Sequence, residues 1–185
     1  GFGSMLVLLP EHNMGFFVID GLAQDHGIEL GREKFQVHFA RGFIDGVESI
    51  LGKPQAFMNR SGPPIRQLAD YFRITKGNLL VIHDDIDLIF GKLKIKEKGG
   101  HGGHNGVKSL MESFGGGDFP RLRVGIGRSE QASVTDHVLG KYTSEEKRQL
   151  QPVVDMAKDA VVAIVTEGLT SGMNRFNGKR PVVSS

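Results

Sequence analysis

Short runs of apolar residues, each the length of one strand, are distributed along the chain. The predicted strands cover residues 5–9, 35–39, 47–51, 79–82 and 122–126. The first and fourth are continuously apolar, which is typical of buried strands, whereas the second and fifth alternate apolar with other residues. We expect a glycine-bearing turn at Arg41-Gly42 to join the second and third strands.

Four other segments carry apolar residues at helical spacing. They run from Asn13 to His26, from Ser61 to Phe72, from Asn105 to Gly115 and from Thr143 to Ile164. In the second, Ile65, Leu68 and Phe72 lie on one face of the predicted helix. Asn105 is placed to cap the third, and we expect Pro152 to kink or restart the last.

Strands that interleave with helices predict an α/β fold. We expect a sandwich in which helices cover both faces of a twisted, mixed and partly parallel sheet. A chain of 185 residues, of which 39% are hydrophobic, is long enough for one domain with its own core. We expect residues 5–185 to form this single domain. We expect residues 1–4, ahead of Met5, to be a cloning remnant outside it.

Composition excludes several classes of protein. The chain has no cysteine, which excludes disulfides, thiolate metal sites and a cysteine nucleophile and fits a reducing compartment such as the cytoplasm. No apolar run approaches the roughly 20 residues that span a bilayer, and no signal peptide is recognisable. The net charge of +2 gives only weak support for binding to nucleic acid.

Lysines at every second position form the clearest charge pattern. They are Lys92, Lys94, Lys96 and Lys98, which share one face if the segment is a strand. Such a row can neutralise successive phosphates of a nucleic acid. On spacing alone, the favoured interpretation is a solvated edge strand whose lysines prevent aggregation.

A glycine-rich segment, residues 99–106, runs from the lysines straight into a predicted helix start. Glycine lets a ligand approach the backbone and a helix N-terminus offers unsatisfied donors, so this loop can face an anion. A zinc site at His101 and His104 is the less favoured interpretation, because the glycines exclude a helical register for the two ligands and no cysteine assists. Asn105 can cap the helix and also contact substrate through its other amide atoms.

Polar residues next to predicted elements are candidates for acid–base chemistry. His12 lies between the first strand and the first helix, where a rigid scaffold can hold a general base. Asp84, at the end of the fourth strand, can accept a hydrogen bond from an imidazole, and Asp85 and Asp87 are equally suitable from the sequence alone. Residues 57–59, Phe-Met-Asn, form either core and cap or the lip of a substrate site.

Several strings closely resemble the bacterial peptidyl-tRNA hydrolases in order and spacing. They are KPQAFMNRSG from Lys53, HDDIDL from His83, GGHGGHNGVKSL from Gly99, RLRVGIGR from Arg121, HVLGKYTSEEK from His137 and GLTSGMNRFNGK from Gly168. The resemblance covers nearly the whole chain. It implies hydrolysis of the ester between a peptide and the 3′-terminal ribose of tRNA, with water as the nucleophile and no cofactor.

The resemblance also implies roles for individual residues. His12 matches the catalytic histidine, and Asp84 matches the carboxylate that keeps this histidine basic. Asn59 and Asn105 complete the implied catalytic set and contact the 3′ end of the substrate. The other implied contacts are Phe57, Met58, Gly102 and His104 near that end, and Lys94, Lys96 and Arg123 on the tRNA phosphates.

One segment departs from the family pattern. Family members carry a GNPG-type turn, with a tyrosine shortly after it, ahead of the catalytic histidine, whereas here residues 8–11 lead directly to His12. A catalytically weak member that still binds RNA is therefore retained as an alternative to the enzyme, and a metal-dependent hydrolase as a more distant one. We expect peptidyl-tRNA as the partner, no membrane contact and a monomer.

Overall fold

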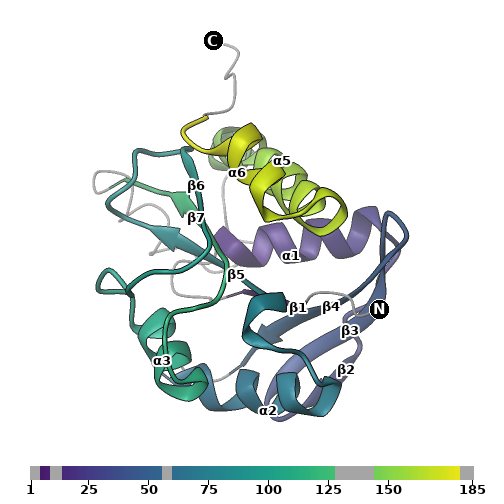
Figure 1. Cartoon of the computed structure of the whole chain (residues 1–185). Coiled ribbons are helices and arrows are strands. Elements are labelled where there is room, and N and C mark those ends of the chain that lie inside the picture. Colours follow the sequence, from purple (N-terminus) through teal and green to yellow (C-terminus); the bar gives the residue numbers. More distant parts are fainter. Residues whose placement is uncertain (1–4, 9–13, 56–59, 128–143, 180–185) are drawn as a thin grey trace.

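The computed structural model describes residues 5–8, 14–55, 60–127 and 144–179 (Figure 1). Seven strands form one sheet in the order β2-β3-β4-β1-β5-β7-β6. They are β1 (Met5–Leu8), β2 (Arg32–Lys34), β3 (Val37–Ile44), β4 (Val47–Pro54), β5 (Leu79–Asp85), β6 (Leu93–Lys96) and β7 (Arg121–Gly125). The pairs β1–β4, β1–β5 and β5–β7 are parallel, whereas β2–β3, β3–β4 and β6–β7 are antiparallel. The prediction of a mixed α/β fold is confirmed.

Helices lie on the two faces of this sheet (Figure 1). They are α1 (Met14–Asp25), α2 (Gly62–Phe72), α3 (Asn105–Phe114), α5 (Ser144–Glu167) and α6 (Leu169–Phe176). Side chains alternate between the faces of a strand, so β5 contributes to two separate cores. Leu80 and Ile82 pack in the core with α1, α5 and α6, while Leu79 and Val81 pack in the core with α2 and α3.

The predicted turn at Arg41-Gly42 is wrong, because these residues lie within β3. The chain reverses instead at Asp45-Gly46, where both residues have positive φ angles of 47° and 84°. This is the conformation that two-residue hairpins require. Gly42 instead leaves room for the side chain of Ile28, since a Cβ at residue 42 would lie 2.7 Å from Cγ1 of Ile28.

Four further details differ from the sequence-based prediction. The last long helix does not restart at Pro152, which lies inside one continuous helix of 24 residues. Helix α6 and strand β2 were not predicted. Helix α3 is capped by the side chain of His104, which accepts a hydrogen bond from the backbone N–H of Val107, and not by Asn105.

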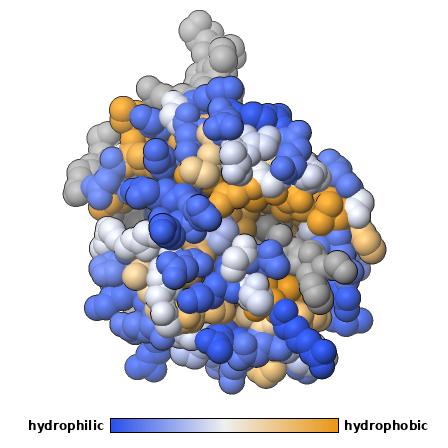
Figure 2. All heavy atoms as spheres, viewed as in Figure 1, coloured by the Kyte–Doolittle hydropathy of each residue, from blue (hydrophilic) through white to orange (hydrophobic). Residues whose placement is uncertain are grey.

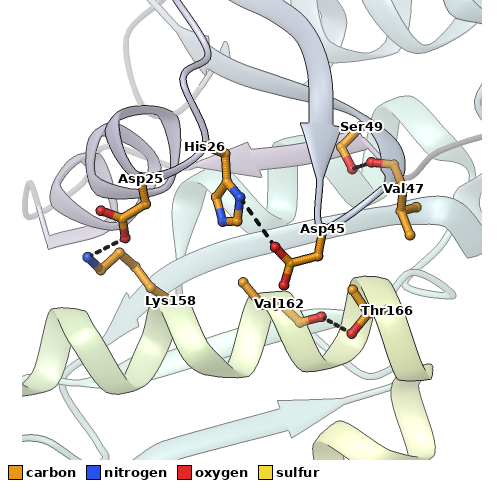
Figure 3. A network of polar contacts seen from close by, with 8 residues as sticks. All are labelled: Asp25, His26, Asp45, Val47, Ser49, Lys158, Val162 and Thr166. Atoms are coloured by element: carbon orange, nitrogen blue, oxygen red, sulfur yellow. Dashed lines mark hydrogen bonds and ion pairs between the residues drawn. The ribbon is translucent and has the colours of Figure 1, made fainter.

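A polar network holds the helices on one side of the sheet together (Figure 3). Lys158 of α5 donates to the carboxylate of Asp25 in α1 at 2.8 Å, and this hydrogen bond raises the pKa of Lys158. The Nδ1 of His26 lies 3.7 Å from Oδ1 of Asp45 at the β3–β4 turn.

The surface that faces the viewer in Figure 2 is mostly hydrophilic. Among the described residues, none of the helices is long and apolar enough to cross a membrane.

Candidate functional site

A cavity of about 420 Å³ opens where β5 ends and the glycine-rich loop before α3 begins. Its lining includes Asp84, Asp85, Lys96, His104, Arg121 and Arg123. Strands β5 and β7 are parallel neighbours, with Asp85 in register with Gly125. The lining residues of β5 and β7 therefore lie side by side, and the loop after β6 closes one side. Polar groups of both charges converge on this cavity.

Asp84 is the most deeply buried carboxylate of the cavity, with 2% of the residue exposed. Its Oδ1 lies 3.9 Å from Nε2 of His104, the N-cap residue of helix α3. The ring of His104 also meets the ring of His83 edge to face, with centroids 4.7 Å apart. A carboxylate and two imidazoles therefore form one compact group at the carboxyl end of β5.

His83 is a neutral member of this group. Burial lowers the pKa of His83 well below the ordinary value of 6.5, and the charge that His104 carries when protonated and the charges of Arg121 and Arg123 lower it further. Its Nδ1 lies 2.8 Å from the backbone oxygen of Asp84, and because a carbonyl oxygen only accepts, Nδ1 carries the proton and donates.

This neutral histidine makes stability depend on pH. Below about pH 6.5, His83 becomes protonated in the unfolded chain but stays neutral in the folded chain. The free energy of unfolding therefore falls as the pH drops towards the lowered pKa of His83 in the folded state. We expect a contribution of about 1.4 kcal/mol per pH unit in this range. His83→Asn keeps a donor near the Nδ1 position but cannot titrate. Denaturant unfolding between about pH 7 and 5.5 should show a shallower pH dependence for this variant, and an unchanged dependence would contradict the assignment.

Asp85 is engaged by Arg123, which lies beside it on β7. The Nε of Arg123 donates to Oδ2 of Asp85 at 2.6 Å, and a second guanidinium nitrogen contacts the same oxygen. Only 10% of the Asp85 side chain and 23% of that of Arg123 are exposed. Two contacts in a partly buried site make this pair more stabilising than an exposed salt bridge.

Arg121 anchors the glycine-rich loop. Its guanidinium donates to three backbone oxygens, those of Gly100 at 2.8 Å, Gly99 at 3.0 Å and Gly117 at 2.7 Å. The group also stacks over the ring of Phe119, at 4.5 Å from its centroid. Only 2% of Arg121 is exposed. A buried cation thus satisfies carbonyls at both ends of the segment that holds α3.

Helices α2 and α3 are joined at their closest approach. The buried backbone N–H of Gly62, the first residue of α2, donates to the hydroxyl of Ser109 in α3 at 2.9 Å. A Cβ on Gly62 would lie 2.1 Å from the backbone oxygen of Ser109, so only glycine fits there without displacing α3. The start of α2, three residues after Asn59, is therefore fixed to the helix that begins at Asn105.

The structure brings together part of the predicted site. Asp84, Gly102, His104, Lys96 and Arg123 line the cavity. Asn105 is exposed at the start of α3, and Lys94 lies on β6 in register with Arg123. Lys92 and Lys98, predicted to share the strand face, fall outside β6. His12, Phe57, Met58 and Asn59 lie outside the described residues.

Comparison with known proteins identifies the family. A sequence profile described as "Peptidyl-tRNA hydrolase" matches residues 10–183. The chain belongs to the peptidyl-tRNA hydrolase family. A peptidyl-tRNA hydrolase of Clostridium perfringens is 42% identical over 168 residues, which is 91% of this chain and 89% of that protein. One from Caldanaerobacter subterraneus subsp. tengcongensis is also 42% identical, over 91% of each chain.

Solved structures of the peptidyl-tRNA hydrolase family share the fold. The crystal structure of the enzyme from Acinetobacter baumannii matches with a TM-score of 0.82 and 34% sequence identity, over 97% of this chain and 96% of that chain. The mixed α/β architecture is therefore that of the peptidyl-tRNA hydrolases. Among the described residues, no group of three or more histidine, aspartate or glutamate side chains is arranged to hold a metal ion.

Sequence reasoning missed His83 and Arg121 as parts of the site and considered Asp85 only as an alternative to Asp84. Arg121 carried a signal, because a cation two residues before Arg123 in an otherwise apolar strand has to find partners when it is buried. The partners themselves were not predictable, since Gly99 and Gly100 are more than 20 residues away in sequence.

Proposed function

We propose that this chain hydrolyses the ester between a peptide and the 3′-terminal ribose of tRNA, and so releases tRNA for reuse in translation. His12 is the general base that activates water, and Asp84 stabilises the imidazolium that forms. Asn59 and Asn105, with Phe57 and Met58 beside them, bind the 3′ end together with Gly102 and His104. Lys94, Lys96 and Arg123 bind phosphates of the tRNA body. This is the activity of the peptidyl-tRNA hydrolases to which the chain belongs.

The register of β1 with β5 is the observation that carries the proposal. Leu8, the last residue of β1, is the partner of Ile82, two residues before Asp84. His12 follows Leu8 by four residues, and four extended residues reach at most about 14 Å. Helix α1 begins two residues after His12. Parallel strands present their carboxyl ends at the same edge, so β1, which ends four residues before His12, leads to the edge where Asp84 lies, and this supports the pairing of His12 with Asp84.

The neighbouring carboxylates support Asp84 as the partner of His12. Asp85 is already committed to Arg123, and Asp87 is exposed. Asp84 is 2% exposed and lines the cavity, so its charge acts there with little screening by water. A buried carboxylate beside an imidazole favours the protonated ring, which is what a general base needs as it takes a proton from water.

The pairing of β6 with β7 supports the phosphate contacts. Lys94 is in register with Arg123 and Lys96 with Arg121, so four cations share one face of two antiparallel strands. Like charges directly opposite each other are unfavourable in a sheet unless something neutralises them. Asp85 offsets one of the four, and a bound phosphate would offset others. The solvated edge strand, favoured by spacing alone, does not account for this concentration of cations beside a cavity.

Hydrolysis of peptidyl-tRNA, measured beside unblocked aminoacyl-tRNA, tests the function. We expect cleavage of the blocked substrate and little cleavage of the unblocked one. Binding of tRNA without cleavage of either substrate would support the alternative of a catalytically weak RNA-binding member. Cleavage that depends on added metal would support a metal-dependent hydrolase instead.

The lysines of β6 provide a prediction about tRNA binding. Lys94→Ala combined with Lys96→Ala should weaken binding to tRNA of any sequence, and each lost phosphate contact should lower the salt slope of binding by roughly one unit. A short substrate without the tRNA body should be hydrolysed almost as well by the double variant as by the parent. Both substrates are measured across a salt series.

The opposite edge of the sheet offers a matched control. Arg32 and Lys34 also alternate on an edge strand, β2, far along the strand order from β6. Arg32→Ala combined with Lys34→Ala should leave tRNA binding unchanged. Equal losses on short and full-length substrates for the β6 variant would mean that its lysines support the fold, and no loss on either would restore the interpretation of a solvated edge strand.

We further propose that residues 5–185 act as one monomeric domain in the cytoplasm. The family and the lack of cysteine support this proposal. Sedimentation of the purified chain should give the mass of one copy, about 20.2 kDa.

A further inference from the structure

The N-cap of helix α3 determines where His104 carries its proton. The backbone N–H of Val107 donates to Nδ1 of His104 at 3.2 Å. A ring nitrogen that accepts a hydrogen bond has a free lone pair and no proton. The proton of the neutral ring therefore lies on Nε2, and Nε2 is the atom that lies 3.9 Å from Oδ1 of Asp84.

His83 has the opposite arrangement. Its Nδ1 donates to the backbone oxygen of Asp84 at 2.8 Å, so the proton is on Nδ1 and Nε2 has none. The rings of His83 and His104 are in contact, edge to face, and both are almost fully buried. Two neighbouring imidazoles thus hold their protons on different nitrogens, each determined by one backbone partner.

We propose that His104 is a positioning residue for Asp84, locked by the cap of α3 into the tautomer that presents Nε2–H to this carboxylate. The proposal rests on the proposed function, in which Asp84 is the partner of His12. Because the N–H of Val107 polarises the ring from the other side, the positive end of helix α3 acts through His104 on Asp84. The ring of His104 orients the carboxylate without adding a second positive charge that would compete with the imidazolium of His12.

Nuclear magnetic resonance of the ring nitrogens tests the tautomers directly and needs no enzymatic activity. In protein labelled with ¹⁵N-histidine, long-range proton–nitrogen spectra distinguish a protonated ring nitrogen from an unprotonated one. We expect His104 to be protonated on Nε2 and His83 on Nδ1, with signals assigned from His104→Asn and His83→Asn. A proton on Nδ1 of His104 would overturn the proposal, whether or not the chain hydrolyses peptidyl-tRNA.

Two substitutions separate the cap from the contact with Asp84. His104→Asn places an oxygen near the position of Nδ1, so it keeps the cap but loses the donor at Nε2. His104→Gln reaches towards the position of Nε2 with an amide N–H but is a poor cap. We expect His104→Asn to keep its Tm and to lose about tenfold in kcat, in addition to any change in KM from the contact of His104 with the 3′ end. His104→Gln should lose roughly 2–4 °C in Tm but only about threefold in kcat.

The order of the two variants decides between the roles of His104. If His104 only caps the helix, His104→Gln will be the slower enzyme and His104→Asn will match the parent, which would overturn the proposal. Equal rises in KM for both, at unchanged kcat, would show that His104 acts only through its contact with the 3′ end of the substrate and would also overturn the proposal. Failure of the parent chain to cleave peptidyl-tRNA would contradict the proposed function alone, because the nitrogen spectra still decide the tautomer.

Discussion

His12→Ala should remove nearly all hydrolysis of peptidyl-tRNA while leaving tRNA binding largely intact. A general base contributes to the transition state more than to the association of the ground state, and its loss typically lowers the rate by about 10²- to 10⁴-fold. Single-turnover hydrolysis and equilibrium binding of tRNA, measured on the same variant, separate the two effects. The binding measurement also confirms that the variant is folded.

A second histidine serves as the control for this variant. His38 lies on β3, in the part of the sheet farthest from β6 and β7 in strand order. His38→Ala should hydrolyse peptidyl-tRNA at the rate of the parent. A loss of only a few-fold in the rate of His12→Ala would contradict the role of general base and indicate packing or capping by residue 12.

Asp84→Asn should lower the rate of hydrolysis less than His12→Ala does. An unchanged pH–rate profile for Asp84→Asn would exclude Asp84 as the partner of His12.

Arg121→Met should destabilise the whole fold as well as the cavity. Methionine retains an apolar stem beside Phe119 but removes the donor to the backbone oxygens of Gly99 and Gly100. The oxygen of Gly117 loses the guanidinium but keeps the N–H of Gly99. We expect a loss of about 2 kcal/mol in the free energy of unfolding, because an acceptor left unsatisfied in a partly buried site costs roughly 1–3 kcal/mol, whereas the exposed Gly100 can bond to water instead. Denaturant unfolding measures the loss.

Arg148 provides the comparison for Arg121→Met. It lies on α5 with 76% of its side chain exposed, paired only with Glu145 among the described residues. Arg148→Met should change the free energy of unfolding by less than about 0.5 kcal/mol. Similar small changes in the free energy of unfolding for both variants would contradict the anchoring role of Arg121.

The rate of hydrolysis by Arg121→Met, measured at a temperature well below its midpoint of unfolding, should also fall, because the loop before α3 has lost its attachment.

Local patterns predicted most of the helices and strands. The spacing of Ile65, Leu68 and Phe72 predicts α2 because one face of that helix is buried. The apolar run at 79–82 predicts β5 because a central strand is buried on both faces. Helix α6 carried the same kind of signal, with Leu169, Met173 and Phe176 at helical spacing, but the segment is short.

What failed was the interpretation of single residues whose purpose lies in distant contacts. Gly42 appeared to mark a turn, yet it makes room for Ile28 within a strand, and the turn lies at Asp45-Gly46. Asn105 appeared to be the cap of α3, yet the neighbouring His104 fills that role. The candidate site was likewise only partly predictable from the sequence. Its residue types were visible in the sequence, but the pairing of Asp85 with Arg123 depends on the register of two strands.

The strand order has a consequence for how the chain acquires its site during synthesis. Strand β7 lies between β5 and β6, although it is made after both. The edge strand β6, with Lys94 and Lys96, therefore has no place in the sheet until residue 125 has left the ribosome, and Arg121 and Arg123 arrive with the same strand. Such non-local pairing is slow compared with helix formation. A nascent chain that ends before β7 therefore lacks both Arg121, which anchors the glycine-rich loop, and half of the four cations on the β6–β7 face.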